Sequence, residues 1–321
     1  MLRLSVNHRK EKRVLACAQE PHDSELAPLL PPDRIHLSKD ISVEGKPRST
    51  SFSTVSHARS EYRKLLLEKS SCRRRRKFVF GAIHEKLFPG FCEVNPFIRD
   101  YDLIVELGNG LTSTIQIRRI TPDDGIGKDQ LLNEGVLLGR TLSNTGNARG
   151  AKVGDLGSMH AIGYRSATTK EVYVTSQETT EKVKIVSSLM REWMEDNMPS
   201  VLKNFLEVDA SMNIAGSLAS MPVGPGSRMM VSINLANAAH LDVDDSSMSV
   251  ALWLEEKPGQ STNWCFVLPN LSHEGSSGVV VRLHHGVVIS WDAKAIFHCT
   301  TKTNVGPDNR VYGCMWGSSK P

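Results

Sequence analysis

The sequence contains no long hydrophobic run. No stretch approaches the roughly 18 to 20 consecutive apolar residues that a helix needs to cross a bilayer. The first twenty residues also lack the apolar segment of a secretory signal. We therefore expect an intracellular protein with no membrane partner. The basic start leaves an organelle transit peptide open, although Glu11 and the scarcity of serine there weaken that interpretation.

Cysteine is also scarce. The six cysteines are spread over 321 residues, and none belongs to a Cys-x-x-Cys pair. This distribution excludes a disulfide scaffold and argues against a zinc site built from cysteines. We expect the thiols to be reduced.

The larger part of the chain lacks an excess of positive charge. Residues 1–77 hold 18 Lys and Arg against 9 Asp and Glu, a net charge of +9, whereas residues 78–321 hold 21 against 26, a net charge of −5. The isoelectric point near 8.7 therefore comes from the N-terminal quarter. It gives no support to a nucleic-acid-binding core.

Residues 1–77 form the first of two predicted divisions. Residues 1–56 are rich in Pro, Ser and charge and show no lasting period, which predicts a disordered tail. A short helix is expected around Tyr62–Lys69. The run Arg73–Lys77 has two interpretations: a solvated linker, or a nuclear-import signal or nucleic-acid contact within residues 59–77.

Residues 78–321 are expected to form one domain, with an N-terminal α/β support (78–207) and a core from about 208 to 321. In the support, residues 101–120 predict two strands around a Gly-Asn-Gly turn, and 158–166 predict another strand. Residues 121–157 are rich in Gly and Asn and predict a long surface loop. Apolar residues at helical spacing from Gln177 to about Leu206 predict one amphipathic helix or two, interrupted at Pro199.

After Val208, short apolar and β-branched runs alternate with turn residues. Six such runs without intervening helices predict an antiparallel sandwich or jelly roll, in a mainly β fold with flanking helices. The runs are Met229–Leu235, Met248–Leu254, Trp264–Leu268, Val279–Leu283, Val287–Trp291 and Arg310–Trp316.

A His-x-Asp motif lies between two of these strands. Residues i and i+2 of an extended chain point to the same side, so His240 and Asp242 can bind one ion. The candidate third ligand is His298, 56 residues after Asp242 at the end of another strand. Two imidazoles and one carboxylate leave coordination positions open, a set that suits Fe(II) oxygenases. Zinc accepts the same ligands but supplies no redox chemistry.

The order of these residues resembles the Fe(II)/2-oxoglutarate-dependent dioxygenases. Their pattern is His-x-Asp, a distal histidine about fifty residues later, and a basic residue on the final strand, here Arg310. The segment "HHGVVISWDAKAIFHCT" is similar to the family's approach to the distal histidine. The resemblance covers roughly residues 160–321. It implies a double-stranded β-helix (jelly roll) core, metal ligands His240, Asp242 and His298, and Arg310 as the anchor for the far carboxylate of 2-oxoglutarate.

Within that superfamily, "VSINLANAAHLDVDD" resembles the TET/JBP group, which oxidises methyl groups on nucleic-acid bases. The chain also departs from the superfamily pattern. Many members have a small hydroxyl residue two positions after the arginine, where this chain has Tyr312, whose phenol could bind the carboxylate from further away.

Four further residues are candidates for the site. Asn234 precedes the metal motif and could meet the co-substrate or the backbone, and Asp245 is either a substrate-orienting carboxylate or a turn residue. Trp316 is a core aromatic or lines the pocket mouth, and His160 is a core or substrate-pocket residue.

The sequence therefore predicts a dioxygenase that uses Fe(II) and 2-oxoglutarate, with ascorbate as a further candidate cofactor. It would use O2 to hydroxylate a C–H bond of an unidentified nucleic-acid base, protein side chain or small metabolite. Two alternatives stay open. One is a non-catalytic jelly-roll binding module with a basic targeting tail, and the other is a redox-inert metallohydrolase, which lacks an evident general base.

Overall fold

The structure is a computed structural model of the 321-residue chain. It describes residues 2–6, 34–37 and most of the range 92–319. The short gaps in that range are 109–110, 122–125, 145–155, 165–171, 174–175, 212–223, 238–239, 243–244, 263, 269–270, 274–278, 302, 304 and 306–307.

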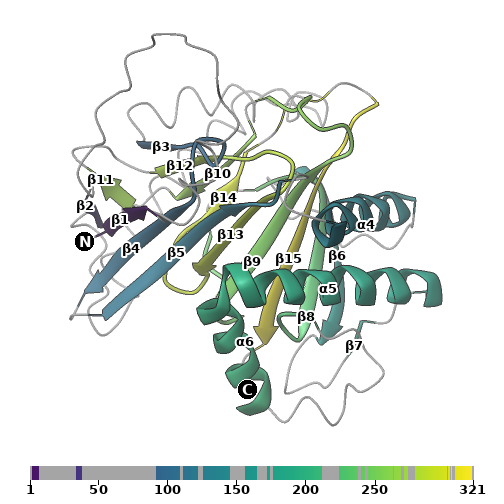
Figure 1. The fold of residues 1–321 in the computed structure, drawn as a ribbon, viewed down its shortest axis with the longest axis horizontal. Coiled ribbons are helices and arrows are strands. Elements are labelled where there is room, and N and C mark those ends of the chain that lie inside the picture. Colours follow the sequence, from purple (N-terminus) through teal and green to yellow (C-terminus); the bar gives the residue numbers. More distant parts are fainter. Residues whose placement is uncertain are drawn as a thin grey trace, which may run out of the picture.

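Two β-sheets and three helices make up the described part of the chain (Figure 1). The large sheet has the strand order β11 (Leu271–His273), β2 (Arg34–Leu37), β1 (Leu2–Val6), β4 (Tyr101–Gly108), β5 (Leu111–Arg119), β13 (Val287–Asp292), β9 (Asp245–Glu255), β15 (Val311–Ser319), β8 (Arg228–Ala236), β6 (Leu156–Tyr164) and β7 (Val172–Tyr173). The small sheet has the order β14 (Cys299–Thr300), β10 (Cys265–Leu268), β12 (Val279–Arg282) and β3 (Cys92–Val94). The helices are α4 (Ile126–Ser143), α5 (Gln177–Asn197) and α6 (Pro199–Ser211).

The large sheet is buried on both faces because its strands alternate between two hydrophobic cores. On β9, Leu252 and Leu254 pack against the helices, whereas Ala251 and Trp253 pack against the small sheet. Successive side chains of a strand point to opposite faces, so each strand serves both cores. We call these faces the helix face and the inner face of the large sheet.

Helices α5 and α6 cover the helix face (Figure 1). The hydroxyl of Ser176 accepts a hydrogen bond from the Thr179 backbone N–H at 3.3 Å and caps the start of α5. The chain breaks at Met198, and Pro199 becomes the first residue of α6, a position that needs no backbone N–H donor. The two helices expected around Pro199 are therefore present.

The surface loop expected over residues 121–157 is wrong for its central part, which forms helix α4. Two glycines suggested a loop, but they serve close packing. A Cβ at Gly135 would meet Leu254 Cδ1 at 2.5 Å, and one at Gly139 would meet the Tyr312 ring at 2.5 Å. Both glycines let the helix lie directly against β9 and β15.

Two strands lie within residues 1–77, where the sequence predicted a disordered tail. Strand β1 pairs with β4, and β2 pairs with β1 and β11. The segment Leu2–Val6 alternates apolar and polar residues over five positions, which is the period of a half-buried strand. The other expectations for this region, including the helix at Tyr62–Lys69 and the role of Arg73–Lys77, lie outside the described residues.

The fold is mainly β with flanking helices, and its core is a jelly roll of two facing sheets, as expected. All six strands predicted after Val208 are present, with ends shifted by no more than three residues. Strands β4, β5 and β6, from the predicted support, join the same large sheet as the strands of the predicted core. Among the described helices, none has the length and apolar character needed to cross a membrane.

Candidate metal centre

Backbone pairing brings the His-x-Asp motif next to the distal histidine. The His240 N–H donates to the His298 carbonyl at 3.0 Å, and the His298 N–H donates to the His240 carbonyl at 3.1 Å. The Asp242 N–H donates to the Ala293 carbonyl at 2.9 Å. After β8 the chain therefore runs alongside residues 293–300, and these hydrogen bonds fix the register of the three side chains.

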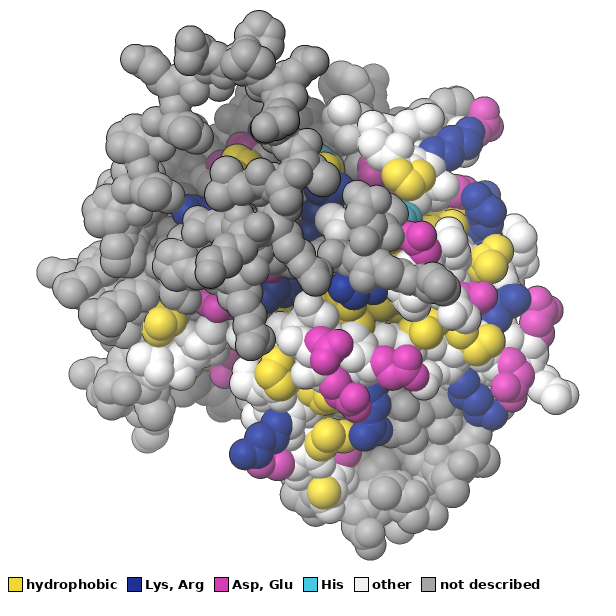
Figure 2. Space-filling model, in the orientation of Figure 1, with side chains coloured by type: hydrophobic (Ala, Val, Ile, Leu, Met, Phe, Trp, Pro, Cys, Tyr) yellow, Lys and Arg dark blue, Asp and Glu magenta, His cyan; other side chains and the backbone are white. Residues whose placement is uncertain are grey.

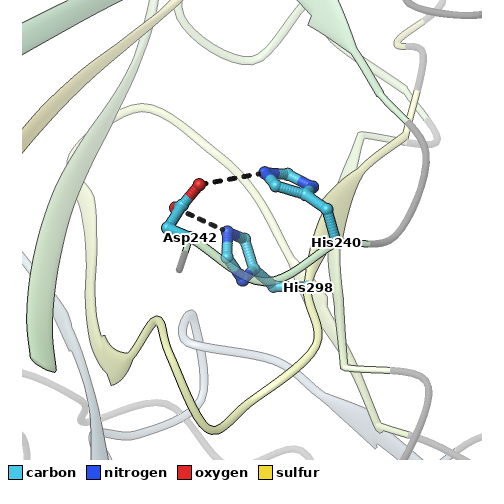
Figure 3. A group of neighbouring side chains, drawn as sticks. All are labelled: His240, Asp242 and His298. Carbon is cyan, nitrogen blue, oxygen red and sulfur yellow. Dashed lines mark ion pairs between the residues drawn. The ribbon is translucent and has the colours of Figure 1, made fainter. Parts of the chain in front are cut away.

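The three side chains point toward one another (Figure 3). His240 Nε2 lies 3.5 Å from Asp242 Oδ1, and His298 Nε2 lies 3.4 Å from Asp242 Oδ2. The three ligand atoms all lie within 4.8 Å of one another. The His298 side chain is 5% exposed, whereas those of His240 and Asp242 are 28% and 22% exposed. The group is therefore closed on the His298 side and open on the other.

His298 is held by aromatic packing and by contacts to Nδ1. Its ring packs against Phe266 and Trp291, and its Nδ1 lies 3.1 Å from the Ile296 carbonyl and 3.2 Å from Trp291 Nε1. A neutral imidazole nitrogen either donates or accepts, so Nδ1 serves one of these two partners at a time. Donation to the Ile296 carbonyl leaves the lone pair on Nε2, the atom that faces Asp242. This is the tautomer that a metal ligand needs.

The Asp242 carboxyl has a pKa below its ordinary value. Burial raises this pKa, but the hydrogen-bonding and charge effects of His298, with the charges of His240 and Arg228, lower it by more. The carboxylate is therefore ionised at neutral pH. Its buried Oδ2 atom has only a long, weak contact, to His298 Nε2 at 3.4 Å, which exceeds the ordinary hydrogen-bond length.

These residues fit a divalent metal ion. Ligand atoms about 2.1 Å from one ion lie about 3 Å apart when they subtend a right angle, so contacts of 3.4 and 3.5 Å need only small side-chain rotations. A bound ion would also satisfy the orphaned Oδ2. Two imidazoles and one carboxylate form the facial set typical of non-haem Fe(II) oxygenases, with the open side free for further ligands.

Arg310 and Tyr312, the predicted co-substrate anchors, lie on the helix face of the sheet. Tyr312 is fully buried, and its ring packs against Gly139 of α4. Arg310 is paired through its carbonyl with the N–H of Glu256, whose carboxylate binds Arg140 of α4. Burial, followed by the charge of Glu256, raises the pKa of the Tyr312 hydroxyl. The structure does not bring these two side chains together with the three candidate metal ligands, which lie on the side of the inner face.

Asn234 has a backbone role. Its φ of 52° is left-handed, a conformation that asparagine tolerates better than most residues, and its side-chain oxygen accepts the Val311 N–H at 3.0 Å. It thereby holds the start of β15 against β8. Asp245 is the first residue of β9, and its side chain lies outside the described residues.

Trp316 and His160 also belong to the helix face. Trp316 is fully buried and donates from Nε1 to Ser187 Oγ of α5 at 3.1 Å, so it is a core residue. His160 lies opposite Val231, a member of the same core, and burial lowers the pKa of its imidazole. Neither residue joins the metal-binding group.

Two residues near the centre were not singled out from the sequence. Trp291 packs on His298, and the charge of Arg228 acts on Asp242. The signal for Arg228 was available, because "RMMVSINLA" is an apolar strand with one cation at its first position. An arginine where a buried strand begins calls for a charged partner.

A cavity of about 320 Å³ lies elsewhere, on the helix-face side of the sheet. It is bounded by β5, by the start of α6 and by the adjoining ends of β9 and β13, and its polar lining includes Gln116, Asn204 and Asp292. None of the three metal-binding residues lines it. The metal centre is therefore defined by converging side chains and not by this cavity.

No family model and no curated protein match the chain. Solved structures with similarity include NgTET1 in complex with 5mC DNA, at 10% identity, covering 82% of this chain and 91% of that chain, with a TM-score of 0.47. Another is a Pseudomonas putida prolyl-4-hydroxylase, at 11% identity, covering 64% and 92%, with a TM-score of 0.37. A third is a Trichoplax adhaerens prolyl hydroxylase in complex with a hypoxia inducible factor oxygen degradation domain peptide fragment, at 14% identity, covering 63% and 82%, with a TM-score of 0.36.

These similarities concern the fold alone. Identities of 10 to 14% and TM-scores below 0.5 add nothing about activity or substrate. The assignment of the site rests on its own geometry.

Proposed function

We propose that the protein is an Fe(II)- and 2-oxoglutarate-dependent dioxygenase. The observation that carries this proposal is the convergence of two imidazole Nε2 atoms and one carboxylate within 4.8 Å on a partly open surface. The products would be succinate, CO2 and a hydroxylated substrate, so that one oxygen atom of O2 enters succinate and the other enters the former C–H bond. When bound, Fe(II) would mediate the reduction of O2, whose four electrons come from 2-oxoglutarate and the substrate C–H bond, two from each.

The residues of the chain supply position and protonation state. With a metal on His298 Nε2, the Nδ1 proton would be donated to the Ile296 carbonyl, and Trp291 and Phe266 fix the plane of the ring. The pairing of His240 with His298 fixes the backbone of both ligands in one register. Ligands held by the scaffold in this way need little rearrangement when the metal binds, which favours affinity.

The test has two readouts, metal binding and succinate release. The purified full chain should bind one Fe(II) in the absence of O2, and with O2 it should convert 2-oxoglutarate to succinate. Loss of a residue that only orients a metal ligand typically lowers metal affinity roughly 10- to 100-fold. His240→Ala removes a ligand itself, so it should lower metal affinity by more than that. Trp264→Phe is a matched control in the core between the sheets, where metal affinity should persist. A chain that binds no Fe(II), or a variant that binds it normally, would contradict the proposal.

The same measurements separate the two alternatives. A non-catalytic binding module would bind no metal at these residues, although it would fold normally. A redox-inert hydrolase would bind zinc and release no succinate from 2-oxoglutarate in the presence of Fe(II) and O2.

We leave the substrate class as a nucleic-acid base, a protein side chain or a small metabolite. Figure 2 shows acidic and basic side chains interspersed over the face on which α5 and α6 lie. Several of these charges form pairs within one helix, such as Lys184 with Glu181 and Arg191 with Glu195. Mixed charges of this kind produce no strong field of one sign. This face therefore offers no strong attraction to nucleic acid, and the basic segment within residues 59–77 is the candidate for it.

A further inference from the structure

The small sheet covers only part of the inner face of the large sheet. The inner residues of β13 and β9, such as Ile289 and Ala251, are buried beneath it. On the next three strands, five inner residues are only half-buried, whereas their neighbours in the chain, such as Val231 and Ile162, pack into the helix-face core. We call these five residues the methionine patch: Met315 on β15, Met230 and Ser232 on β8, and Met159 and Ala161 on β6.

The strand register makes the members of the methionine patch neighbours. Met315 pairs with Met230, and Met230 pairs with Ala161, so these three form one row across the sheet. In the adjoining row, Ser232 pairs with Met159. Neighbouring strands lie about 4.8 Å apart, and residues two apart on a strand lie about 6.7 Å apart. The five side chains therefore form one continuous surface.

The segment that carries His240 connects the end of β8 to the small sheet. Directly after β8, the Asn237 N–H donates to the Thr300 carbonyl of β14 at 3.1 Å, and His240 then pairs with His298. Strand β14 pairs with β10 on its other side, and it also contacts β8. His240 therefore lies beyond His298 from β10, on the side of β8.

Exposure of the metal-binding group increases in the same direction. His298 packs against Phe266 of β10 and Trp291 of β13, and its side chain is 5% exposed. The His240 side chain, on the side of β8, is 28% exposed. The group therefore opens toward the half-buried part of the inner face, where β15 and β8 lie.

The strand register also gives the separation between the patch and the metal-binding group. Trp291, which packs on His298, pairs with Ser249 of β9. Met315 pairs with Ala251, two residues further along the same strand. With strands about 4.8 Å apart and about 3.3 Å per residue, the Cα atoms of Trp291 and Met315 lie about 12 Å apart. Both residues have long side chains on the inner face, so a small ligand beside the metal would contact the patch.

The chemistry of the patch is apolar. Three of its members are methionines, whose flexible thioethers adapt to the shape of a ligand and make favourable contacts with aromatic rings. Its one polar member, Ser232, donates its hydroxyl to the Gly313 carbonyl at 3.3 Å. Arg228, one row further on, already interacts within the chain. A charged ligand group on the patch would therefore lose water without gaining a partner, at a cost in free energy.

We propose that the methionine patch binds the part of the substrate that carries the reacting C–H bond, and that this part is uncharged and apolar. The inference rests on the proposed function, because it concerns the surface beside the same candidate metal centre. It narrows the substrate class by chemistry. The charged ends of lysine, arginine, aspartate and glutamate side chains are excluded as reacting groups, whereas uncharged aliphatic and aromatic groups fit the patch.

The first experiment tests the position of the patch. The full chain is loaded with Fe(II) and treated briefly with ascorbate and hydrogen peroxide, and methionine sulfoxide is measured at each position by peptide mass spectrometry. Oxidants formed at a bound iron attack nearby side chains, so Met230 and Met315 should be oxidised several-fold faster than Met248. Met248 is the matched control, because it is also half-buried but packs against the helix-face core. In His240→Ala, which loses a ligand, the difference should disappear.

The second experiment tests the preference for an uncharged group with two probes of the same shape, neutral tert-butylbenzene and cationic phenyltrimethylammonium. Mn(II) accepts the same nitrogen and oxygen ligands, and when bound it speeds the relaxation of nearby probe protons in NMR, with the Zn(II)-loaded chain as the diamagnetic reference. The neutral probe should be relaxed at least about tenfold more than the cation at equal concentration. Met230→Gln should reduce the effect on the neutral probe several-fold, and Met248→Gln should leave it unchanged.

The metal affinity of each variant keeps the outcomes distinct. Oxidation of Met230 and Met315 no faster than that of Met248, or equal relaxation of the two probes, would overturn the inference and leave the proposed function intact. If the unmodified chain binds no Fe(II), the proposed function falls and the inference falls with it.

Discussion

At the scale of single residues, the positions of the candidate metal ligands depend on backbone carbonyl groups of neighbouring residues. The Ile296 carbonyl lies 3.1 Å from His298 Nδ1, and the Ala293 carbonyl accepts the Asp242 N–H at 2.9 Å. Both carbonyls belong to the turn after β13, which the Asp292 carboxylate caps by accepting the N–H groups of Lys294 and Ala295 at 3.0 Å. A change in that turn would displace two ligands at once.

Burial of the thiols gives a prediction on chemical reactivity. Desolvation raises the pKa of Cys265, Cys299 and Cys314 to about 12. The thiolate is the reactive form, and at pH 8 it makes up only about one part in ten thousand of such a thiol. Iodoacetamide at pH 8 should therefore leave these three cysteines unlabelled in the native protein and label them fully in denaturant, as measured by peptide mass spectrometry. Native labelling within minutes would contradict their burial.

The residue scale also shows where the sequence was sufficient. His240, Asp242 and His298 were selected by chain order, and the structure brings all three together. Arg310 was selected by its distance along the chain from His298, but distance along the chain does not determine the face of a strand. The face on which Arg310 lies is set by neighbours such as Tyr312, which packs on α4. The sequence does not reveal this packing.

At the scale of elements, the strands of the jelly roll could be predicted and helix α4 could not. Each strand shows its own signal as a short β-branched run between turn residues. The signal of α4 is weakened by two interior glycines, which are poor helix formers. Gly135 and Gly139 are explained only by Leu254 and Tyr312, more than a hundred residues away in the chain. Tertiary packing here overrides local propensity.

The close packing at Gly139 can be tested by adding one methyl group through an alanine substitution. Gly139→Ala would place a Cβ 2.5 Å from the Tyr312 ring, which is fully buried and cannot move aside freely. We expect the free energy of unfolding to fall by about 1 to 3 kcal/mol, the usual cost of overpacking. Denaturant titration followed by circular dichroism measures it.

The matched control lies in the same helix. A Cβ at Gly127 would meet nothing within 4 Å. Gly127→Ala should therefore be neutral or should raise the free energy of unfolding by up to about 1 kcal/mol, because alanine favours the helix. If Gly139→Ala also proved neutral or stabilising, the close approach of α4 to β15 would be incorrect.

At the scale of the whole molecule, the excess positive charge and the candidate metal centre lie in different parts of the chain. The basic excess lies in residues 1–77, whereas the candidate metal ligands lie in the mildly acidic remainder. Strand β1 nevertheless joins the large sheet beside β4, so part of the basic segment belongs to the folded body. Removing residues 1–77 would therefore uncover a strand edge as well as remove charge, and a binding experiment on such a truncated chain would mix the two effects.

Replacing charges within the intact chain avoids this problem. If Arg73–Lys77 binds phosphates, changing its five cations to glutamine should weaken binding to a DNA duplex. It should also reduce the slope of log affinity against log salt by about 0.9 for each phosphate that is no longer neutralised. Fluorescence anisotropy between about 50 and 200 mM salt measures the slope. Glutamine at Lys182, Lys184, Arg191 and Lys203 is the control, because these cations have carboxylate partners on their own helices and should leave the slope unchanged. An unchanged slope after the Arg73–Lys77 replacement would remove the electrostatic argument for a nucleic-acid substrate, and the search would turn to protein side chains and small metabolites.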